Sequence, residues 1–168
     1  MKSGKCFIEI EGNSLQGAGS FMADAYSKVT GKIGVCMSTM GPGAENMTIG
    51  VGTAHSDSVP LLAITGQLST SVLGKGYQQE TDHVGLFTPI TKWSTQVLRT
   101  EMLPTTMKRA FYLAFEGRPG PIHLDLPTDV QLGRIDAELE DAKPRALSHI
   151  APPQDSVIQV ASMLTESK

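Results

Sequence analysis

The chain has 168 residues, of which 40% are hydrophobic and 18% are charged, and its formal net charge is −3. This length allows one domain with its own hydrophobic core and a short extension, and the composition is that of an ordinary globular protein. The absence of a basic patch argues against a nucleic-acid partner, and the lack of both a ~20-residue apolar run and a signal peptide argues against a membrane span and predicts a cytoplasmic location.

A strand and a helix are predicted at the start of the chain. Phe7 to Ile10 has the apolar, β-branched character of a strand, and the turn-forming cluster Glu11 to Ser14 ends it. A helix should follow and end at the glycine cap Gly31, because the next apolar and small residues recur at helical spacing. These residues are Gly17, Ala18, Phe21, Met22, Ala25 and Tyr26.

The next stretch predicts a strand, a tight glycine turn and a helix. Residues 35–37 form an apolar run without polar alternation, which is typical of a strand buried on both faces of a parallel sheet. Cys36 in this run is expected to be buried and reduced, and Cys6 is expected to be reduced as well. The Gly-Pro-Gly turn at residues 41–43 ends the strand, and a helix is expected from Ala44 onward. In a parallel sheet such a turn lies at the carboxyl edge, where ligands bind.

The ligand at this turn is expected to be a neutral ring rather than a phosphate. Glycine turns before helices often hold phosphates, because free backbone N–H groups and the helix dipole attract an anion. Here Pro42 has no N–H, Glu45 places a negative charge in the first helical turn, and the glycine spacing fits neither common phosphate-binding motif. A hydrogen-bonding ring against the Gly-Pro-Gly backbone, with Asn46 beside it, suits these residues better. The alternative is that the glycines only form the corner and that Asn46 caps the helix.

A second buried strand and a long loop follow. Val59 to Thr65 is an unbroken apolar run, and the polar segment from Leu68 to Asp82 is longer than most loops in compact domains. Such a loop is either functional or a surface excursion. His55 and His83 lie beside loops without a second ligand at helical spacing. They are therefore interpreted as solvated or capping residues, and no metal site is expected.

The rest of the domain continues the alternation of helices and strands. The pattern predicts a helical turn, a short strand, a helix and a final strand over residues 83–87, 93–97, 104–117 and 122–126. In the final strand His123 and Asp125 share one face and the aliphatic residues share the other. This alternation predicts an α/β fold with a parallel sheet.

The character of the chain changes after Gln131. Residues 134–156 are charged and then proline-bearing, which is typical of a linker that leaves a domain. From Asp155 onward the apolar spacing predicts a helix that has to dock onto another element. The expected organisation is a domain over residues 1–133, followed by a linker and the first helix of an absent domain over residues 134–168.

Five motifs in this chain follow one another at a characteristic spacing: FMADAYSKVTGK (21–32), GPGAEN (41–46), DSVPLLAITGQ (57–67), QETD (79–82) and GRPGPIHLDLP (117–127). Each motif alone is weak. In this order they resemble the N-terminal, pyrimidine-binding domain of thiamine diphosphate enzymes in the acetolactate (acetohydroxyacid) synthase large-subunit family.

The resemblance implies a three-layer αβα domain with a mainly parallel central sheet, here without the family's usual first strand and helix. Such a domain holds the aminopyrimidine ring of thiamine diphosphate, while a separate C-terminal domain, usually of the partner subunit, holds Mg²⁺ and the diphosphate. By position, Pro42 and Asn46 would line the pyrimidine, and Gln79 would reach the reacting end of the cofactor. The family usually has a phenylalanine before that glutamine, where this chain has Gln78, so the contribution of the loop to substrate fit stays open.

The family's catalytic glutamate has two candidate positions in this chain. In the family it hydrogen-bonds a pyrimidine nitrogen, and a buried carboxyl suits this role because it can share a proton with the ring. Counting back from Phe21 places Gln16 there, which cannot ionise. Counting forward from the strand at Phe7 places Glu11 there, and Glu11 is the favoured position. The alternative for Glu11 is an exposed turn residue.

The resemblance implies a partial chain of an acetolactate synthase-like transferase of branched-chain amino acid biosynthesis, inactive alone. It would contribute the pyrimidine half of a site for 2-keto acid decarboxylation and C–C bond formation, and Mg²⁺ would bind only with the C-terminal domain, whose Gly-Asp-Gly motif is not in this sequence. The alternatives are a non-catalytic dimerising or regulatory module and a relative of pyruvate oxidase or of another 2-keto acid decarboxylase. A homodimer through this domain is expected, because apolar surface would otherwise stay exposed.

Overall fold

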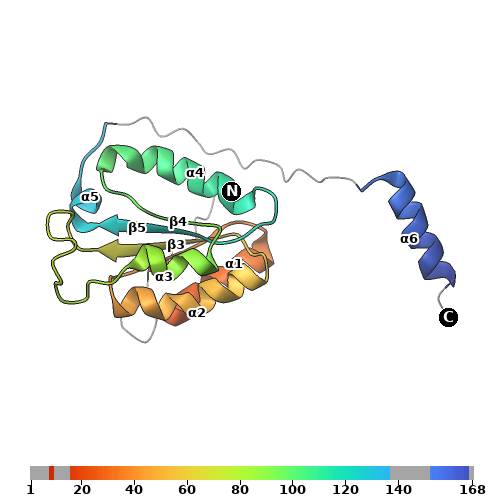
Figure 1. The fold of residues 1–168 in the computed structure, drawn as a ribbon, viewed down its shortest axis with the longest axis horizontal. Coiled ribbons are helices and arrows are strands. Elements are labelled where there is room, and N and C mark those ends of the chain that lie inside the picture. The colour runs from red at the N-terminus through yellow and green to blue at the C-terminus, as the bar shows by residue number, and fades with distance from the viewer. Residues whose placement is uncertain (1–7, 10–15, 137–151, 167–168) are drawn as a thin grey trace, which may run out of the picture.

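The residues that the structure describes fold around one sheet of five parallel strands in the order β1-β2-β3-β5-β4 (Figure 1). The strands are Ile8–Glu9 (β1), Gly34–Ser38 (β2), Leu61–Gln67 (β3), Trp93–Gln96 (β4) and Ile122–Pro127 (β5). The computed structural model describes residues 8–9, 16–136 and 152–166. The predicted α/β class and the order of strands and helices are confirmed, whereas the expected turn over residues 11–14 lies outside the described residues.

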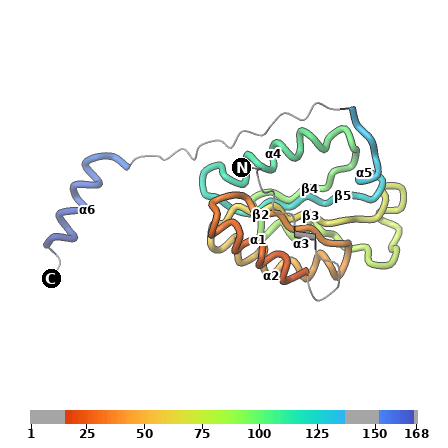
Figure 2. The backbone as a smooth tube through the Cα atoms, turned by 180° about the vertical axis from the view of Figure 1, so that it is seen from behind, coloured from red at the N-terminus to blue at the C-terminus, as the bar shows by residue number. Residues whose placement is uncertain are grey.

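Helices cover both faces of the sheet, as the two opposite views show (Figure 1, Figure 2). One face carries α1 (Gln16–Thr30), α2 (Pro42–Ser56) and α3 (His83–Phe87), and the other carries α4 (Leu103–Phe115). The short helix α5 (Thr128–Leu132) follows β5, and two 3-10 turns, η1 (Thr88–Ile90) and η2 (Thr100–Met102), precede β4 and α4.

Each face of the sheet has its own apolar core, because successive side chains of a strand point to opposite faces. On the face of α1 to α3, Cys36, Leu61 and Ala63 belong to the same cluster as buried residues of the helices, among them Met47 and Phe87. On the face of α4 the cluster contains Leu62, Ile64, Ala110, Ala114, Ile122 and Leu124. Cys36 is a buried free thiol, as expected, and burial raises its pKa to about 12.

The helix after the Gly-Pro-Gly turn begins at Pro42 rather than at Ala44. Proline is well suited to the first helical turn, because its φ is already helical and its missing N–H would have no partner there. Gly41 is the N-cap residue, and Asn46 lies inside the helix. The alternative interpretation of Asn46 as the helix cap is therefore wrong.

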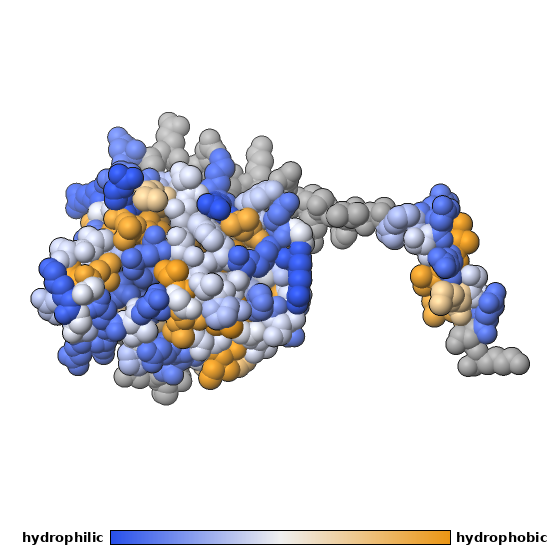
Figure 3. Space-filling model, in the orientation of Figure 1, coloured by the Kyte–Doolittle hydropathy of each residue, from blue (hydrophilic) through white to orange (hydrophobic). Residues whose placement is uncertain are grey.

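The last described helix is α6 (Gln154–Glu166), all of whose side chains are exposed. Its large apolar residues Val157, Ile158 and Met163 are among them, and Figure 3 shows hydrophobic side chains along this helix. Among the helices that the structure describes, none combines the length and the hydrophobicity that a membrane span needs.

Candidate functional site

The Gly-Pro-Gly corner between β2 and α2 lies at the carboxyl edge of the sheet. Gly41 has φ 60° and ψ −123°, a backbone conformation that side chains larger than hydrogen strongly disfavour. Gly43 is buried, and a Cβ built on it would lie 2.8 Å from Thr39 Cγ2 and 3.2 Å from Gln16 Nε2. The first glycine therefore makes the corner, and the second lets the start of α1 approach it.

The long loop after β3 reaches this corner. A Cβ on Gly41 would lie 2.9 Å from both the Cβ and the carbonyl oxygen of Gln79, which itself has a positive φ of 66°. The Thr81 hydroxyl donates to Glu45 Oε1 on α2 at 3.3 Å. The structure thus places Gln79 against the turn that contains Pro42, and both side chains are exposed. The expected contacts of Pro42 and Gln79 with the cofactor stay predictions.

The carboxylate of Glu80 organises the tip of this loop. It accepts hydrogen bonds from the backbone N–H groups of Gly74, Gly76 and Tyr77, the latter two at 2.8 and 3.0 Å. These hydrogen bonds, with that from Gly74 the largest contribution, lower the pKa of Glu80. Three amides that would otherwise face solvent are paired with one acid, so the loop has a defined shape.

His83, at the start of α3, is the residue that joins the corner to the sheet. Its side chain is buried, so the interpretation as a solvated or capping histidine is wrong, and the side chain that caps α3 belongs to Asp82. His83 Nε2 accepts the N–H of Gly41 at 3.0 Å, and Nδ1 lies 2.8 Å from Asp125 Oδ1. A residue 42 positions away from each partner is thus fixed between them.

Asp125 is a fully buried carboxylate with three donors around it. Thr65 donates to Oδ1 at 2.6 Å, Gln96 donates to Oδ2 at 2.7 Å, and His83 lies on Oδ1. Burial alone would raise the pKa of Asp125, but the hydrogen bonds from His83, Thr65 and Gln96 outweigh it and hold the pKa below its ordinary value. The carboxyl is therefore ionised and acts only as an acceptor.

A second row of polar side chains crosses the sheet at His123, two residues before Asp125 on β5. His123 Nε2 lies 2.9 Å from Thr65 Oγ1 and its Nδ1 lies 2.8 Å from Ser94 Oγ, while Phe87 stacks on the ring at 4.1 Å. Because Thr65 gives its proton to Asp125, His123 Nε2 must be the donor to Thr65. Burial lowers the pKa of His123 to about 3, so the ring is neutral.

The strand register explains why these residues meet. Thr65 pairs with Asp125 and Ala63 with His123 between β3 and β5, while Gln96 and Ser94 of β4 pair with the same two β5 residues. The polar face predicted for residues 122–126 therefore exists, and it faces α3. This pattern was the available sequence signal for the network: a central strand with a polar face needs partners on neighbouring strands.

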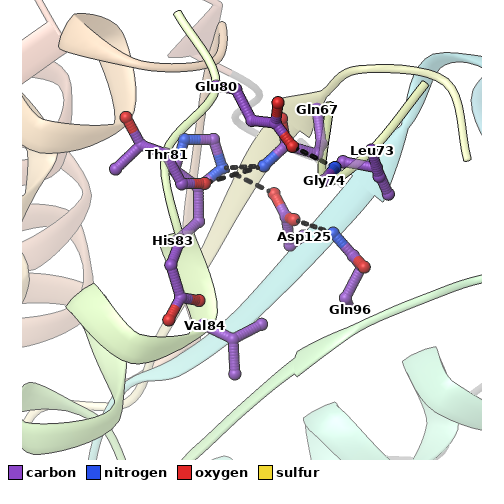
Figure 4. Close-up of a pocket in the computed structure, with 10 residues that line it drawn as sticks. Gln67, Leu73, Gly74, Glu80, Thr81, His83, Val84, Gln96 and Asp125 are labelled. Atoms are coloured by element: carbon purple, nitrogen blue, oxygen red, sulfur yellow. Dashed lines mark hydrogen bonds and ion pairs between the residues drawn. The ribbon is translucent and has the colours of Figure 1, made fainter. Parts of the chain in front are cut away.

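A pocket of about 400 Å³ opens beside His83 at the same edge of the sheet. Figure 4 shows His83, Gln67, Asp125 and Gln96 converging, with Glu80 turned toward Gly74. Gln67 Nε2 donates to the Thr81 carbonyl at 3.0 Å and lies 3.2 Å from His83 Nδ1. The polar side chains that converge beside the pocket are thus already held in place by hydrogen bonds to other residues of this chain.

Of the two candidate positions that the resemblance gives for a catalytic glutamate, one lies inside the described residues and one outside them. Gln16 is the first residue of α1, 4% exposed, and its amide lies beside Gly43. Glu11 lies outside the described residues, so its role stays a prediction. The described side chain beside Gly43 is therefore the amide of Gln16, which can hydrogen-bond a ring but cannot take up a proton.

The backbone N–H groups at the corner determine which kind of ligand it can bind. Pro42 has no N–H, and the N–H of Gly41 is already bound by His83. An anion cradle needs several free amides at a helix start, and two of the first positions here offer none. Within the described residues there is also no group of three or more His, Cys, Asp or Glu side chains arranged to hold a metal ion.

Comparison with known proteins gives one family match and several relatives. Residues 7–86 match the family described as "Thiamine pyrophosphate enzyme, N-terminal TPP binding domain". The probable acetolactate synthase large subunit of Methanocaldococcus jannaschii is 42% identical over 160 residues, which cover 90% of this chain and 26% of that protein.

Two further relatives are similar over shorter stretches. The acetolactate synthase of Arthrospira platensis is 50% identical over 121 residues, which cover 72% of this chain and 21% of that protein. The acetolactate synthase isozyme 3 large subunit of Escherichia coli is 47% identical over 109 residues, which cover 65% of this chain and 19% of that protein. The chain thus spans about a fifth to a quarter of the length of these relatives.

Proposed function

Because residues 7–86 belong to the N-terminal TPP binding domain of thiamine pyrophosphate enzymes and the chain is related to acetolactate synthase large subunits, we propose that it holds the pyrimidine half of a thiamine diphosphate site. The ring would lie against the corner of residues 41–43, with Pro42, Asn46 and Gln79 around it. The remaining steps of the enzyme's activity would depend on residues outside this half of the site.

The observation that supports this proposal is that the first two backbone positions of the corner, Gly41 and Pro42, offer no free N–H group. His83 already accepts the N–H of Gly41 at 3.0 Å, Pro42 has none, and Glu45 adds a negative charge to the first turn of α2. A diphosphate at this position would meet a carboxylate and few donors, whereas an uncharged heterocycle needs neither a positive potential nor several amides. The corner therefore favours the ring end of the cofactor over its anionic end.

The residues of this chain have distinct roles in the proposal. Pro42 and the two glycines would give a rigid surface, Asn46 would supply hydrogen bonds, and Gln79 in the loop lies beside Gly41. Glu11 would hold a proton at a pyrimidine ring nitrogen, while Gln16 beside Gly43 could only donate or accept a hydrogen bond. When bound, thiamine diphosphate supplies the nucleophilic carbon for decarboxylation of a 2-keto acid.

The finer parts of the proposal concern the assembly. We propose that the chain works as a partial chain of an acetolactate synthase-like transferase and as a homodimer through this domain. Mg²⁺ and the diphosphate would be held by a C-terminal domain of the same enzyme. Alone, the chain should therefore bind the cofactor weakly and form no acetolactate from pyruvate.

The test divides the cofactor into its two ends. In ¹⁵N-labelled protein, thiamine should shift the amide resonances of Gly41, Asn46 and Gln79, and thiamine diphosphate with Mg²⁺ should shift the same set. Inorganic pyrophosphate should leave these resonances unchanged. Shifts caused by pyrophosphate at the amides after residue 43, saturable micromolar binding, or acetolactate production by the chain alone would contradict the proposal.

A second candidate function, a non-catalytic binding module, is favoured by one observation: the buried residue beside Gly43 is the amide Gln16. Exchange of the thiazolium C2 proton in deuterated water separates the candidates. If Glu11 acts on the bound ring, the protein should accelerate this exchange at saturating thiamine diphosphate, and Glu11→Gln should remove the acceleration. Equal exchange with and without protein would favour the binding module.

A further inference from the structure

His83 has a single proton arrangement that satisfies both of its neighbours. Asp125 accepts from Thr65 and Gln96 at 2.6 and 2.7 Å, so its carboxylate requires a proton on His83 Nδ1, 2.8 Å away. The backbone N–H of Gly41 can only donate, so it requires a bare Nε2. The two requirements arise from different elements, and both select the neutral Nδ1–H form of the ring.

Among the described residues, Gln67 offers a competing hydrogen bond to the His83 ring. Its Nε2 lies 3.2 Å from His83 Nδ1, and a hydrogen bond there would need Nδ1 without a proton. The contact with Asp125 is shorter and involves a charged acceptor, and Gln67 Nε2 already donates to the Thr81 carbonyl at 3.0 Å. The proton therefore stays between His83 and Asp125.

We propose that His83 is a positioning residue of the candidate site: Asp125 fixes its Nδ1–H tautomer, and its bare Nε2 holds the N–H of Gly41 and with it the Gly-Pro-Gly corner. The chain of contacts runs from the carboxylate in the centre of the sheet to the surface on which the ring would lie. The consequence for ring binding rests on the proposed function, whereas the hold on Gly41 does not.

Two substitutions separate the halves of this contact. In His83→Gln the side-chain oxygen can reach the place of Nε2 and accept from Gly41, whereas in His83→Asn the shorter amide can replace only the Nδ1 donor to Asp125. Amide hydrogen exchange of Gly41 should become about tenfold faster in His83→Asn and stay within about threefold of the unsubstituted chain in His83→Gln. Thiamine-induced shifts at Gly41 and Asn46 should weaken in the first variant and persist in the second.

Equal exchange rates of Gly41 in the two variants, whether raised or unchanged, would overturn the proposal, because a merely structural histidine would respond to both alike. A long-range ¹H–¹⁵N spectrum of the unsubstituted chain gives a test that needs no variant. The proton on Nδ1 with a bare Nε2 supports the proposal, and an Nε2–H ring or an imidazolium at pH 7 overturns it. If thiamine shifts nothing in the unsubstituted chain, the ring-binding role fails together with the proposed function, while Gly41 exchange still decides the hold on the corner.

Discussion

The ring of His123 shows how a single buried residue makes the stability of this domain depend on pH. Its pKa is lowered to about 3, chiefly by burial, and an unfolded histidine titrates near 6.5. Between these values the unfolded chain binds more protons than the folded chain, so the free energy of unfolding falls as the pH falls. The pKa of Asp125 is also lowered, so this group too makes the free energy of unfolding fall as the pH falls. Its contribution is lost only below its ordinary pKa of 3.8.

Between pH 6.5 and pH 4.5 a comparison with a variant at His123 reports this histidine, because the two proteins share all their other titrating groups. We expect the free energy of unfolding, measured by urea denaturation, to drop by roughly 2–3 kcal/mol more in the unsubstituted chain than in His123→Gln across this window. The glutamine cannot titrate, so the difference between the two proteins should narrow as the pH falls. A constant difference would show that His123 is not kept neutral in the folded protein.

Gly41 is the residue whose conformation defines the corner. Its φ of 60° and ψ of −123° exclude most side chains, and a Cβ would meet Gln79 at 2.9 Å. We expect Gly41→Ala to lower the free energy of unfolding by about 3 kcal/mol and to abolish the thiamine-induced shifts. The matched control is Gly31→Ala, which also has a positive φ (67°) but open space around the Cβ.

For the control we expect a loss of only about 1 kcal/mol, with the thiamine shifts intact. The comparison therefore separates the positive φ that both glycines share from the contact and the rarer backbone conformation at Gly41. Similar losses of stability and of thiamine shifts in the two variants would mean that the corner tolerates a side chain.

At the scale of elements, the shape of the loop of residues 68–82 depends on the carboxylate of Glu80. Glu80 accepts from three backbone amides, and the exposed Lys75 lies between two of them. We expect Glu80→Gln to weaken these hydrogen bonds, because a neutral amide is a poorer acceptor than a carboxylate. Trypsin should then cleave after Lys75 several-fold faster in limited proteolysis.

The control for the loop is Glu101→Gln, which removes an exposed carboxylate from η2 and leaves the loop unchanged. Its cleavage rate at Lys75 should equal that of the unsubstituted chain. Cleavage at Lys75 that is equally fast in all three proteins would show that Glu80 does not determine the shape of the loop.

Local patterns predicted most of the elements, and long-range contacts account for what they missed. The apolar run of β3 and the corner at residues 41–43 follow from neighbouring residues, so spacing alone was sufficient. The burial of His83 was not predictable in this way, because Asp125 is 42 positions away and meets it only through the register of the sheet. The polar face of β5 indicated that partners exist, but not which residues provide them.

At the scale of the whole molecule, the outer surface of α1 and α2 carries apolar side chains without an assigned role. Phe21 and Ile49 are 44% and 65% exposed, and Figure 3 shows hydrophobic side chains on the side of the domain where α2 lies. Exposed apolar groups of this kind favour association with another surface. The expected homodimer would cover them.

We therefore predict that light scattering gives a mass that rises with concentration toward that of a dimer. The double variant Phe21→Glu with Ile49→Glu should remain a monomer, because burying two new charges in an apolar interface is costly, and glutamate is well tolerated on a helix surface. The control is Val157→Glu with Ile158→Glu on α6, which also exposes apolar residues. If the unsubstituted chain is a strict monomer, or if only the α6 variant dissociates, then α1 and α2 do not form the interface.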